Sequence, residues 1–186
     1  MTRIVAGTVG GRRIEVPRSG TRPTSERVRE ALFARLEHYG VLDGARVLDL
    51  CAGSGALGLE AASRGAGDVT LVDSSRAASE ICRRNIRALG LRGLRVVTAK
   101  AAAFLTGAAG APVDLVLIDP PYELAEEELT AILSPLTRSE DPWLAPRAVV
   151  VVERSTRSPE PAWPQGLGRF ADKRYGETTL WFAEPL

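Results

Sequence analysis

The sequence has few of the residues on which several common kinds of functional site depend. It contains one histidine and two cysteines among 186 residues, and Cys51 and Cys82 do not have the spacing of metal ligands. We therefore expect no metal site and no histidine-based catalytic triad, and the scarcity of cysteine fits a reducing, cytoplasmic compartment. No apolar run approaches membrane-spanning length and no signal-peptide core is present near the N-terminus, so we expect no contact with a membrane.

Lysine is almost absent, and the net charge is close to zero. Two of the 24 basic residues are lysines, and the whole chain carries a formal charge of +1. The charge is nevertheless uneven, because residues 1–29 contain seven arginines against two glutamates. A basic segment on a nearly neutral protein predicts a local contact with a polyanion.

The order of apolar and amphipathic segments predicts one α/β domain after a short N-terminal extension. Residues 1–40 read as a basic arm or hairpin followed by a helix, which Thr24 or Ser25 can cap. Residues 41–186 alternate between strand and helix patterns, which is typical of a mostly parallel, doubly wound sheet. Strands are expected at 45–50, 68–73, 94–98, 113–119 and 147–152, and helices at 56–64, 75–89, 101–106 and 125–134. Two further strands, at 167–172 and 178–182, predict a C-terminal antiparallel hairpin.

A glycine-rich loop follows the first predicted strand of this domain. Gly53, Gly55 and Gly58 match the pattern G-x-G-x-x-G, whose glycines permit a tight turn and a close approach of the backbone to a ligand. Asp73 follows twenty residues after Gly53, where a carboxylate can accept both hydroxyls of an adenosine ribose. These features suit either a nicotinamide dinucleotide or S-adenosylmethionine. Asp49, just before the loop, favours S-adenosylmethionine, because a carboxylate suits an ammonium group and would repel a pyrophosphate.

The most informative motif is the tetrapeptide Asp119-Pro120-Pro121-Tyr122, which follows the apolar run at 113–118. Two consecutive prolines force the chain to leave the strand, so a carboxylate, backbone carbonyls and an aromatic ring are held at the edge of the sheet. Open α/β sheets bind their ligands at this edge. The motif therefore suits a flat base with an exocyclic amino group, whose N–H bonds meet the acceptors while the ring stacks on the base.

Together, the glycine loop and the tetrapeptide resemble the class I S-adenosylmethionine-dependent methyltransferases, in particular the branch that methylates exocyclic amino groups. The resemblance implies a Rossmann-like fold with a seven-stranded sheet and S-adenosyl-L-methionine as cofactor. It also implies a catalytic group of Asp119, Pro120, Pro121 and Tyr122, in which Asp119 and the Pro120 carbonyl accept from the target amine. The cofactor-binding residues would be Asp49, Leu50, Cys51, Gly53, Gly55, Asp73, Ser74, Lys100, Ala101 and Asp119. Because an ammonium cannot accept from the adenine amine, backbone contacts are expected at Lys100.

A narrower resemblance covers nearly the whole chain. Segments at 3–7, 11–13, 22–33 and 175–180 are similar to segments of the bacterial 16S rRNA guanine-N2-methyltransferases that modify guanine-966. This likeness implies a monomeric, cytoplasmic enzyme without a metal, which acts on 16S rRNA within the small ribosomal subunit or its assembly intermediate. The residues expected to contact RNA are Arg3, Arg12, Arg13, Arg22, Thr24, Arg27 and Arg29.

Other functions remain open from the sequence. A DNA or RNA adenine-N6 methyltransferase could use the same tetrapeptide, although the chain has little room for the target-recognition domain that a DNA enzyme needs. A nicotinamide-dependent oxidoreductase fits the glycine loop, but it leaves residues 119–122 without a purpose. A non-catalytic RNA-binding protein could also have this fold, since a fold does not establish activity. Glu153, after the apolar run at 149–152, is a further candidate to face the site.

Overall fold

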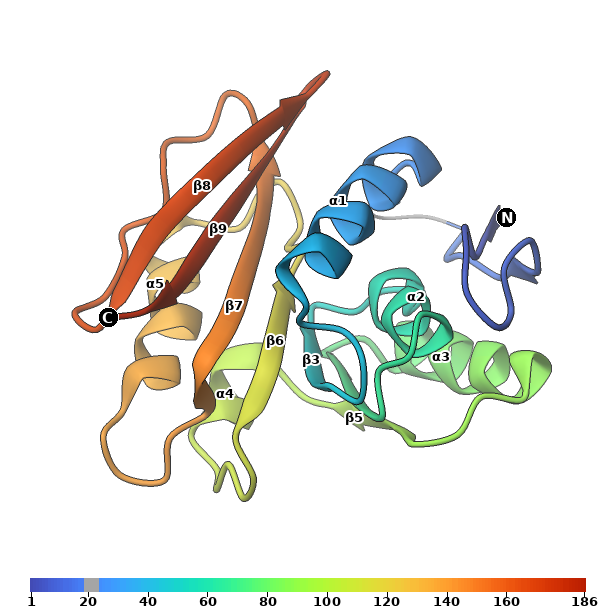
Figure 1. Cartoon of the computed structure of the whole chain (residues 1–186), viewed down its shortest axis with the longest axis horizontal. Coiled ribbons are helices and arrows are strands. Elements are labelled where there is room, and N and C mark those ends of the chain that lie inside the picture. Colours follow the sequence, from blue (N-terminus) through green and yellow to red (C-terminus); the bar gives the residue numbers. More distant parts are fainter. Residues whose placement is uncertain (19–23) are drawn as a thin grey trace.

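The protein is built around one seven-stranded sheet (Figure 1). A computed structural model describes residues 1–18 and 24–186, and the strand order in the sheet is β5-β4-β3-β6-β7-β9-β8. Strands β3 to β7 are parallel, whereas β9 is antiparallel to both β7 and β8, so the predicted doubly wound sheet with an antiparallel hairpin is confirmed. The strands are β3 (Arg46–Leu50), β4 (Asp68–Asp73), β5 (Leu94–Thr98), β6 (Val113–Ile118), β7 (Leu144–Ser155), β8 (Leu167–Tyr175) and β9 (Thr178–Pro185).

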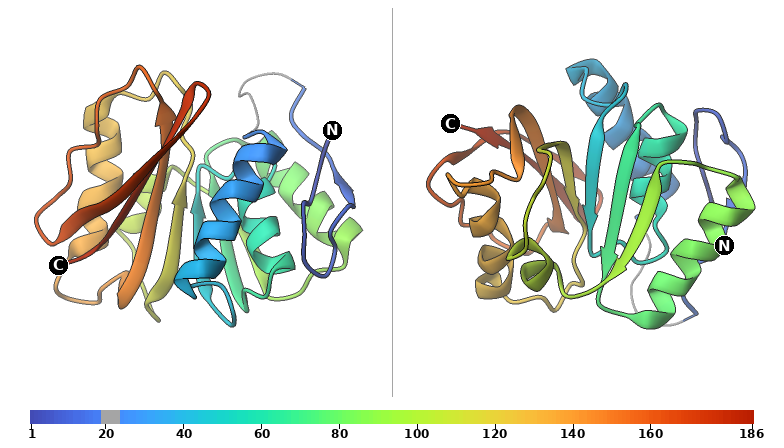
Figure 2. Two further views of the ribbon diagram at one scale, coloured as in Figure 1. Left: turned by 45° about the horizontal axis from the view of Figure 1, so that its top comes forward. Right: turned by 90° about the horizontal axis from the view of Figure 1, so that it is seen from below.

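Helices cover both faces of this sheet (Figure 2). The layer that packs with Val47 and Leu117 consists of α1 (Glu26–Tyr39), α2 (Ala56–Ser63) and α3 (Arg76–Leu89). The layer that packs with Leu48 and Ile118 consists of α4 (Ala101–Leu105), α5 (Glu126–Leu133) and the 3-10 helix η1 (Ser134–Thr137). Neighbouring residues of a strand thus point to different helix layers, as the two-residue period of a strand requires.

Helix α1 belongs to the same core as the sheet. The Ser25 hydroxyl caps it by accepting from the Val28 N–H at 3.2 Å, and Gly40 ends it with a φ of 71°. Its buried side chains include Leu32 and Phe33, which pack in one cluster with the central strands. The predicted boundary between residues 40 and 41 therefore divides one packed unit, and a role of residues 1–40 in RNA binding stays a prediction.

The N-terminal arm, residues 1–18, contains the short strands β1 (Thr2–Arg3) and β2 (Arg13–Ile14) and lies against α2 and α3 (Figure 1). Glu60 of α2 is fully buried and accepts from the backbone N–H groups of Val5 and Ala6 at 2.9 and 3.0 Å. Gly7 comes so close to Ser63 that a Cβ atom would lie 2.0 Å from the Ser63 carbonyl oxygen. The arm is thereby fixed to the helix that follows the glycine loop.

A second contact joins the arm to the glycine loop itself. Asn85 of α3 is buried, and its amide nitrogen donates at 3.0 Å to the carbonyl oxygens of both Glu15 and Ser54. Its amide oxygen accepts from the Glu15 N–H at 2.8 Å. Because Glu15 belongs to the arm and Ser54 to the glycine loop, this one amide fixes the two segments relative to each other.

The C-terminal hairpin is longer than the sequence predicts. Strand β8 extends to Tyr175 and strand β9 begins at Thr178, so only Gly176 and Glu177 form the turn. The pairing of Ser155 with Thr178 places this turn beside the carboxyl end of β7. Polar residues in the outer half of β8 hide its strand character, because an edge strand gains its stability from the ladder of hydrogen bonds to its neighbour.

Candidate active site

Three acidic side chains meet at the carboxyl edge of the sheet because of the strand register. The chain leaves β3 toward β4 and β5 and returns on the other side as β6, so the strand order reverses between β3 and β6, where such sheets bind ligands. Asp49 pairs with Leu117, and Leu117 pairs with Val151. Asp119 and Glu153 each follow two residues later, so all three acids face the same helix layer.

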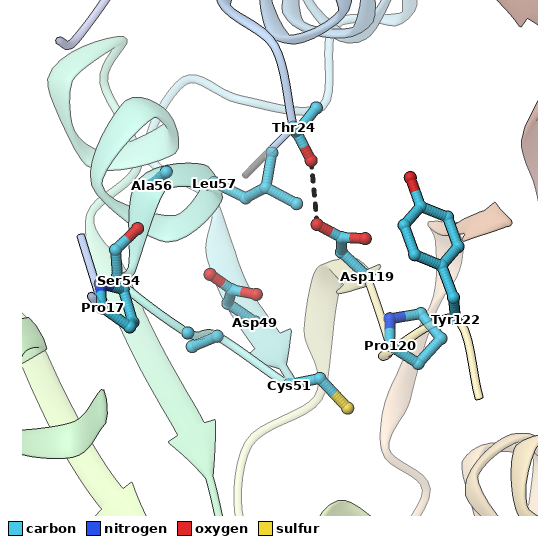
Figure 3. Close-up of a pocket in the computed structure, with 12 residues that line it drawn as sticks. Pro17, Thr24, Asp49, Cys51, Ser54, Ala56, Leu57, Asp119, Pro120 and Tyr122 are labelled. Atoms are coloured by element: carbon cyan, nitrogen blue, oxygen red, sulfur yellow. Dashed lines mark hydrogen bonds between the residues drawn. The ribbon is translucent and has the colours of Figure 1, made fainter. Parts of the chain in front are cut away.

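Asp49 and Asp119 line one narrow pocket of about 50 Å³ (Figure 3). Asp49 is only 1% exposed, and its Oδ2 accepts from the Gly58 N–H at 2.9 Å, whereas its Oδ1 has no hydrogen-bond partner among the described residues. Burial raises the pKa of Asp49 to about 8, and the charges of Asp119 and Asp73 add to the rise. Among the described residues that line the pocket there is no arginine or lysine. An unpartnered, buried acceptor in acidic surroundings fits the positively charged end of S-adenosylmethionine.

The glycine loop is braced by Asp73 at the end of β4. Its Oδ2 accepts from the Gly53 N–H at 2.8 Å and its Oδ1 accepts from the Ser75 N–H at 2.8 Å. Each oxygen keeps a further lone pair, so the carboxylate can still accept ribose hydroxyls. At Gly58 an added Cβ would lie 2.9 Å from the Leu71 side chain and 3.1 Å from the carboxylate of Asp49. Helix α2 therefore packs on strands β3 and β4 as closely as the third glycine of the pattern permits.

The remaining predicted cofactor residues lie at or just after the carboxyl ends of strands β3, β4 and β5. Leu50 is fully buried in β3, Ser74 is exposed after β4, and Lys100 and Ala101 follow β5 at the start of α4. None of these four residues lines the narrow pocket. Their contacts with the cofactor stay predictions.

The two cysteines are packing residues. Cys51 lines the pocket with a φ of 62°, a left-handed conformation that costs a non-glycine residue about 1–2 kcal/mol. Burial raises the pKa of both Cys51 and Cys82 to about 12, and the Cys82 thiol donates to the Gly53 carbonyl at 3.1 Å. Both groups are thiols at neutral pH, which argues against a nucleophilic role.

The tetrapeptide forms one wall of the pocket. Burial raises the pKa of Asp119 to about 6, while a hydrogen bond from Thr24 opposes that rise. Pro120 is buried, and the Leu124 N–H donates to the Pro121 carbonyl at 3.0 Å, which turns the chain away from the sheet. The Tyr122 ring is 54% exposed and stands beside Asp119, where a base could stack on it (Figure 3).

Thr24, which the sequence predicts as an RNA contact, points into the site, and its contact with RNA stays a prediction. Its side chain is buried, and Oγ1 lies 2.8 Å from both Asp119 Oδ2 and Glu153 Oε2. Burial and the charge of Asp119 raise the pKa of Glu153 to about 8. Sequence reasoning missed this role of Thr24 because a threonine before a helix resembles a cap, and in the structure the cap is Ser25.

Most of the arginines predicted to contact RNA are exposed. Arg3 pairs with Glu26 at 2.9 Å, and the guanidinium of Arg12 donates to carbonyl oxygens at the C-terminal end of α3, including that of Leu89 at 3.1 Å. Arg13 and Arg27 are at the surface. Arg22 lies outside the described residues.

Arg29 does not share that exposure. It is completely buried, and its Nε lies 3.5 Å from Oε2 of Glu60. Its guanidinium also donates to the Arg3 carbonyl and to the Thr2 hydroxyl. Burial lowers the pKa of Arg29, while the charge of Glu60 opposes this effect. The structure thus places Arg29 where it holds the arm and not where it could meet a phosphate, since its helix face is covered by the arm.

The described residues contain neither a metal-binding cluster nor a membrane-spanning helix. Residues 1–18 and 24–186 contain no group of three or more His, Cys, Asp or Glu side chains that could hold a metal ion. Within the same residues no helix is long and apolar enough to cross a membrane.

The fold and the site place the chain among the class I S-adenosylmethionine-dependent methyltransferases, as the sequence predicts. The family model described as conserved hypothetical protein 95 matches residues 2–184, and the chain belongs to that family. One relative, "Ribosomal RNA small subunit methyltransferase D" of Escherichia coli (strain K12), is 38% identical over 178 residues, which are 94% of this chain and 85% of the relative. The protein of the same name from Haemophilus influenzae is 34% identical over 163 residues, covering 84% of this chain and 80% of the relative.

Solved structures give the same result. The yhhF protein of Escherichia coli is 36% identical and superposes with a TM-score of 0.82, covering 99% of this chain and 97% of the other. A hypothetical protein of Thermus thermophilus is 31% identical with a TM-score of 0.80, covering 99% of both chains. The predicted family and fold are therefore confirmed, and the chain is a methyltransferase with S-adenosylmethionine as methyl donor.

Proposed function

We propose that the protein methylates the exocyclic N2 of a guanine in 16S rRNA of the small ribosomal subunit. The observation that carries this proposal is the half-buried acceptor Asp119, which stands beside the exposed Tyr122 at the mouth of the cofactor pocket. The names of the relatives support small-subunit rRNA as the substrate. The similarity of residues 22–33 to the guanine-966 enzymes supports the base, and a cytoplasmic monomer is the state we expect.

The chain's own residues activate the target amine. The lone pair of an exocyclic amine is delocalised into the ring, so the nitrogen needs acceptors that hold its N–H bonds and turn the lone pair toward the methyl donor. Asp119 can do this with the oxygen that is turned toward Tyr122, while its other oxygen is held by Thr24 (Figure 3). The Pro120 carbonyl is the second acceptor. When bound, S-adenosylmethionine supplies an electrophilic methyl group, and Asp49 holds its positively charged end.

A second cavity offers a route for the target base. It has a volume of about 510 Å³, and Thr24 and Tyr122 separate it from the narrow pocket that they also line. Its other walls come from the start of α1, from Glu153 and from the turn of the C-terminal hairpin. A base that leaves its helix needs such a space beside the reacting group. Arg27 and Arg174 at its rim suit the flanking phosphates.

The site does not favour a nicotinamide-dependent oxidoreductase or a DNA adenine methyltransferase. A nicotinamide dinucleotide would bring a pyrophosphate into a pocket whose charged lining residues are Asp49 and Asp119. A DNA adenine methyltransferase would need a separate recognition domain, whereas residues 1–18 are an arm and residues 24–40 contain a helix, both packed on the catalytic unit. An RNA adenine substrate is distinguished by identifying the modified nucleoside.

The test is to replace Asp119 and to follow methyl transfer. Small subunits that lack the modification are incubated with labelled S-adenosylmethionine, and the labelled nucleoside is identified by chromatography. The wild-type protein should yield N2-methylguanosine, and Asp119→Asn should lower the single-turnover rate by at least about 10²-fold because it removes the charged acceptor. Cofactor binding, measured by calorimetry, should change far less.

Asp114→Asn is the matched control. Asp114 lies near the start of β6, the strand that Asp119 follows, and its carboxylate accepts from the Arg46 N–H at the opposite edge of the sheet. This variant should keep the wild-type rate. Label recovered as N6-methyladenosine, or full activity of Asp119→Asn, would contradict the proposal. Stronger labelling of subunits than of naked 16S rRNA would support an assembled substrate.

A further inference from the structure

The hydroxyl of Thr24 cannot satisfy both of its acidic neighbours when both are ionised. Oγ1 lies 2.8 Å from Asp119 Oδ2 and 2.8 Å from Glu153 Oε2. A hydroxyl has a single hydrogen, so it can donate to only one carboxylate. At 2.8 Å the second contact would bring two oxygen atoms together without a hydrogen between them, in a site where Thr24 and Glu153 are both buried. The geometry is satisfied when one of the two carboxyl groups carries a proton.

We propose that Glu153 is a positioning residue that stays protonated in the working enzyme and donates a hydrogen bond to the Thr24 oxygen. The Thr24 hydroxyl is thereby directed to donate to an ionised Asp119. The chain of donors then runs from Glu153 through Thr24 to Asp119 Oδ2. It leaves the other oxygen of Asp119 for the target amine. The catalytic part of this proposal rests on the proposed function, whereas the protonation of Glu153 in the free protein does not.

The environment of each acid decides which of them holds the proton. Burial raises the pKa of Glu153 to about 8, and the nearby charge of Asp119 adds to the rise, while the pKa of Asp119 reaches only about 6. On β9, the residue paired with Glu153 is the apolar Leu180. The charged or titratable residues that line the cavity on the open side of Glu153 are Arg27, Tyr122, Arg174, Tyr175 and Glu177.

This arrangement fits the proton balance of methyl transfer. The amine nitrogen forms a bond to the methyl carbon, the carbon–sulfur bond breaks with its electron pair on sulfur, and the nitrogen becomes positively charged. Asp119 takes one N–H proton and becomes neutral, which leaves a neutral methylated amine. The proton on Asp119 then passes to solvent, which returns Asp119 to its ionised form while Glu153 keeps its own proton.

The first test uses the free protein and needs no RNA. Protein with ¹³C-labelled glutamate carboxyl groups is titrated by NMR, and the Glu153 signal is assigned by its loss in Glu153→Gln. Glu153 should titrate several pH units above an ordinary glutamate, and lower in Asp119→Asn than in the wild type because a neighbouring charge is gone. Titration of Glu153 near its ordinary value would overturn the proposal, whether or not the protein methylates rRNA.

The second test separates positioning from structure by single-turnover rates between about pH 5 and 9, on either side of the raised pKa of Glu153. The wild-type rate should fall above about pH 8, where Glu153 loses its proton. Glu153→Gln mimics the protonated acid because its amide can donate to Thr24, so it should keep the rate at neutral pH within about fivefold and should not show this alkaline fall. Glu153→Ala and Thr24→Val should lose at least about tenfold, and Thr24→Ser should restore most of the rate. Exposed Glu127→Gln, in α5, is the control for loss of a carboxylate elsewhere. Equal losses in Glu153→Gln and Glu153→Ala, with the alkaline decline unchanged, would overturn the proposal.

Discussion

At the scale of single residues, the site depends on acids that are kept out of water. Asp49 is buried, has one carboxylate oxygen without a partner among the described residues, and has a pKa raised to about 8 by burial. At neutral pH without a cofactor the side chain is therefore protonated. A bound cation favours the ionised form, so cofactor binding and loss of the Asp49 proton are linked.

This linkage predicts a pH dependence of cofactor affinity. Because the raised pKa keeps Asp49 protonated below about pH 8, S-adenosylmethionine should bind more tightly as pH rises toward that value, by up to roughly tenfold per pH unit. Calorimetry at neutral pH in buffers of different ionisation enthalpy should detect a proton released on binding. Asp49→Asn should bind more weakly, without this proton release. Equal proton release in wild type and variant would show that Asp49 is not the group involved.

Most of these residues could be predicted from the sequence, and the exception has a physical reason. Asp49, Asp119 and Glu153 all follow or end apolar strands, so strand periodicity and the carboxyl-edge rule bring them together. Thr24 lies 95 residues before Asp119 and 129 before Glu153, and only the packing of α1 on the sheet brings it to them. No local pattern contains that information.

At the scale of elements, the arm is fixed by buried polar groups as well as by apolar contacts. Glu60 is the centre of this set, since it accepts from two backbone N–H groups of the arm and pairs with Arg29 of α1 and with Arg64. A buried charge without its partners is costly, so these groups hold their arrangement together. The burial of Glu60 could be predicted from the sequence, because it is a lone acid in an otherwise apolar helix. The burial of Arg29 could not, because in the sequence it resembles exposed arginines such as Arg27.

Gly7 provides a test of how tightly the arm is docked. Gly7→Ala should destabilise the protein by more than about 2 kcal/mol, because a left-handed φ costs roughly 1–2 kcal/mol and a Cβ would in addition meet the Ser63 carbonyl at 2.0 Å. Gly11→Ala is the matched control, with a φ of 83° against 84° at Gly7 and no atom within 4 Å of the added Cβ. Urea unfolding gives both free energies. Equal losses in the two variants would mean that the contact with Ser63 contributes nothing.

The predicted order of helices and strands is confirmed because each segment of the α/β core has a strong local period. The bounds agree within one or two residues for the parallel strands up to β6 and for the helices of the two layers. Strand β7 is longer than predicted, since it begins at Leu144, before Pro146, with an irregular register. A proline usually ends a strand pattern, and only the pairing of Leu144 with Val113 of β6 shows that the strand begins before Pro146.

At the scale of the whole molecule, the charge is divided between two regions with different functions. The pocket is acidic and suits a cationic cofactor, whereas exposed arginines such as Arg13 and Arg27 lie on the arm and α1. Phosphate contacts give affinity that weakens with salt, and they carry little sequence information. If these arginines contact phosphates, as proposed, sequence-specific recognition is left to the cavity beside Glu153 and to the shape of the RNA.

This division predicts the salt dependence of RNA binding. Arg27→Ala should weaken binding to small subunits and reduce the slope of log affinity against log salt by nearly one, because one phosphate contact is lost. Arg147→Ala removes an exposed arginine that lies among residues at the amino edge of the sheet, with Asp43 and Asp114, and should leave the slope unchanged. Filter binding at several salt concentrations measures both. A larger change of the salt slope in Arg147→Ala than in Arg27→Ala would mean that RNA binds at the amino edge of the sheet.

The docking of the arm also has a consequence for the order in which the chain folds. The arm is synthesised first, yet its hydrogen-bond partners in α2 and α3 lie between 54 and 77 residues later in the chain. Its contacts with these helices cannot form until α2 and then α3 have been made, and closing so long a loop favours late attachment. The segment made first is then among the last to be fixed. A newly made chain therefore completes α2 and α3 before the arginines of its arm take up their final positions.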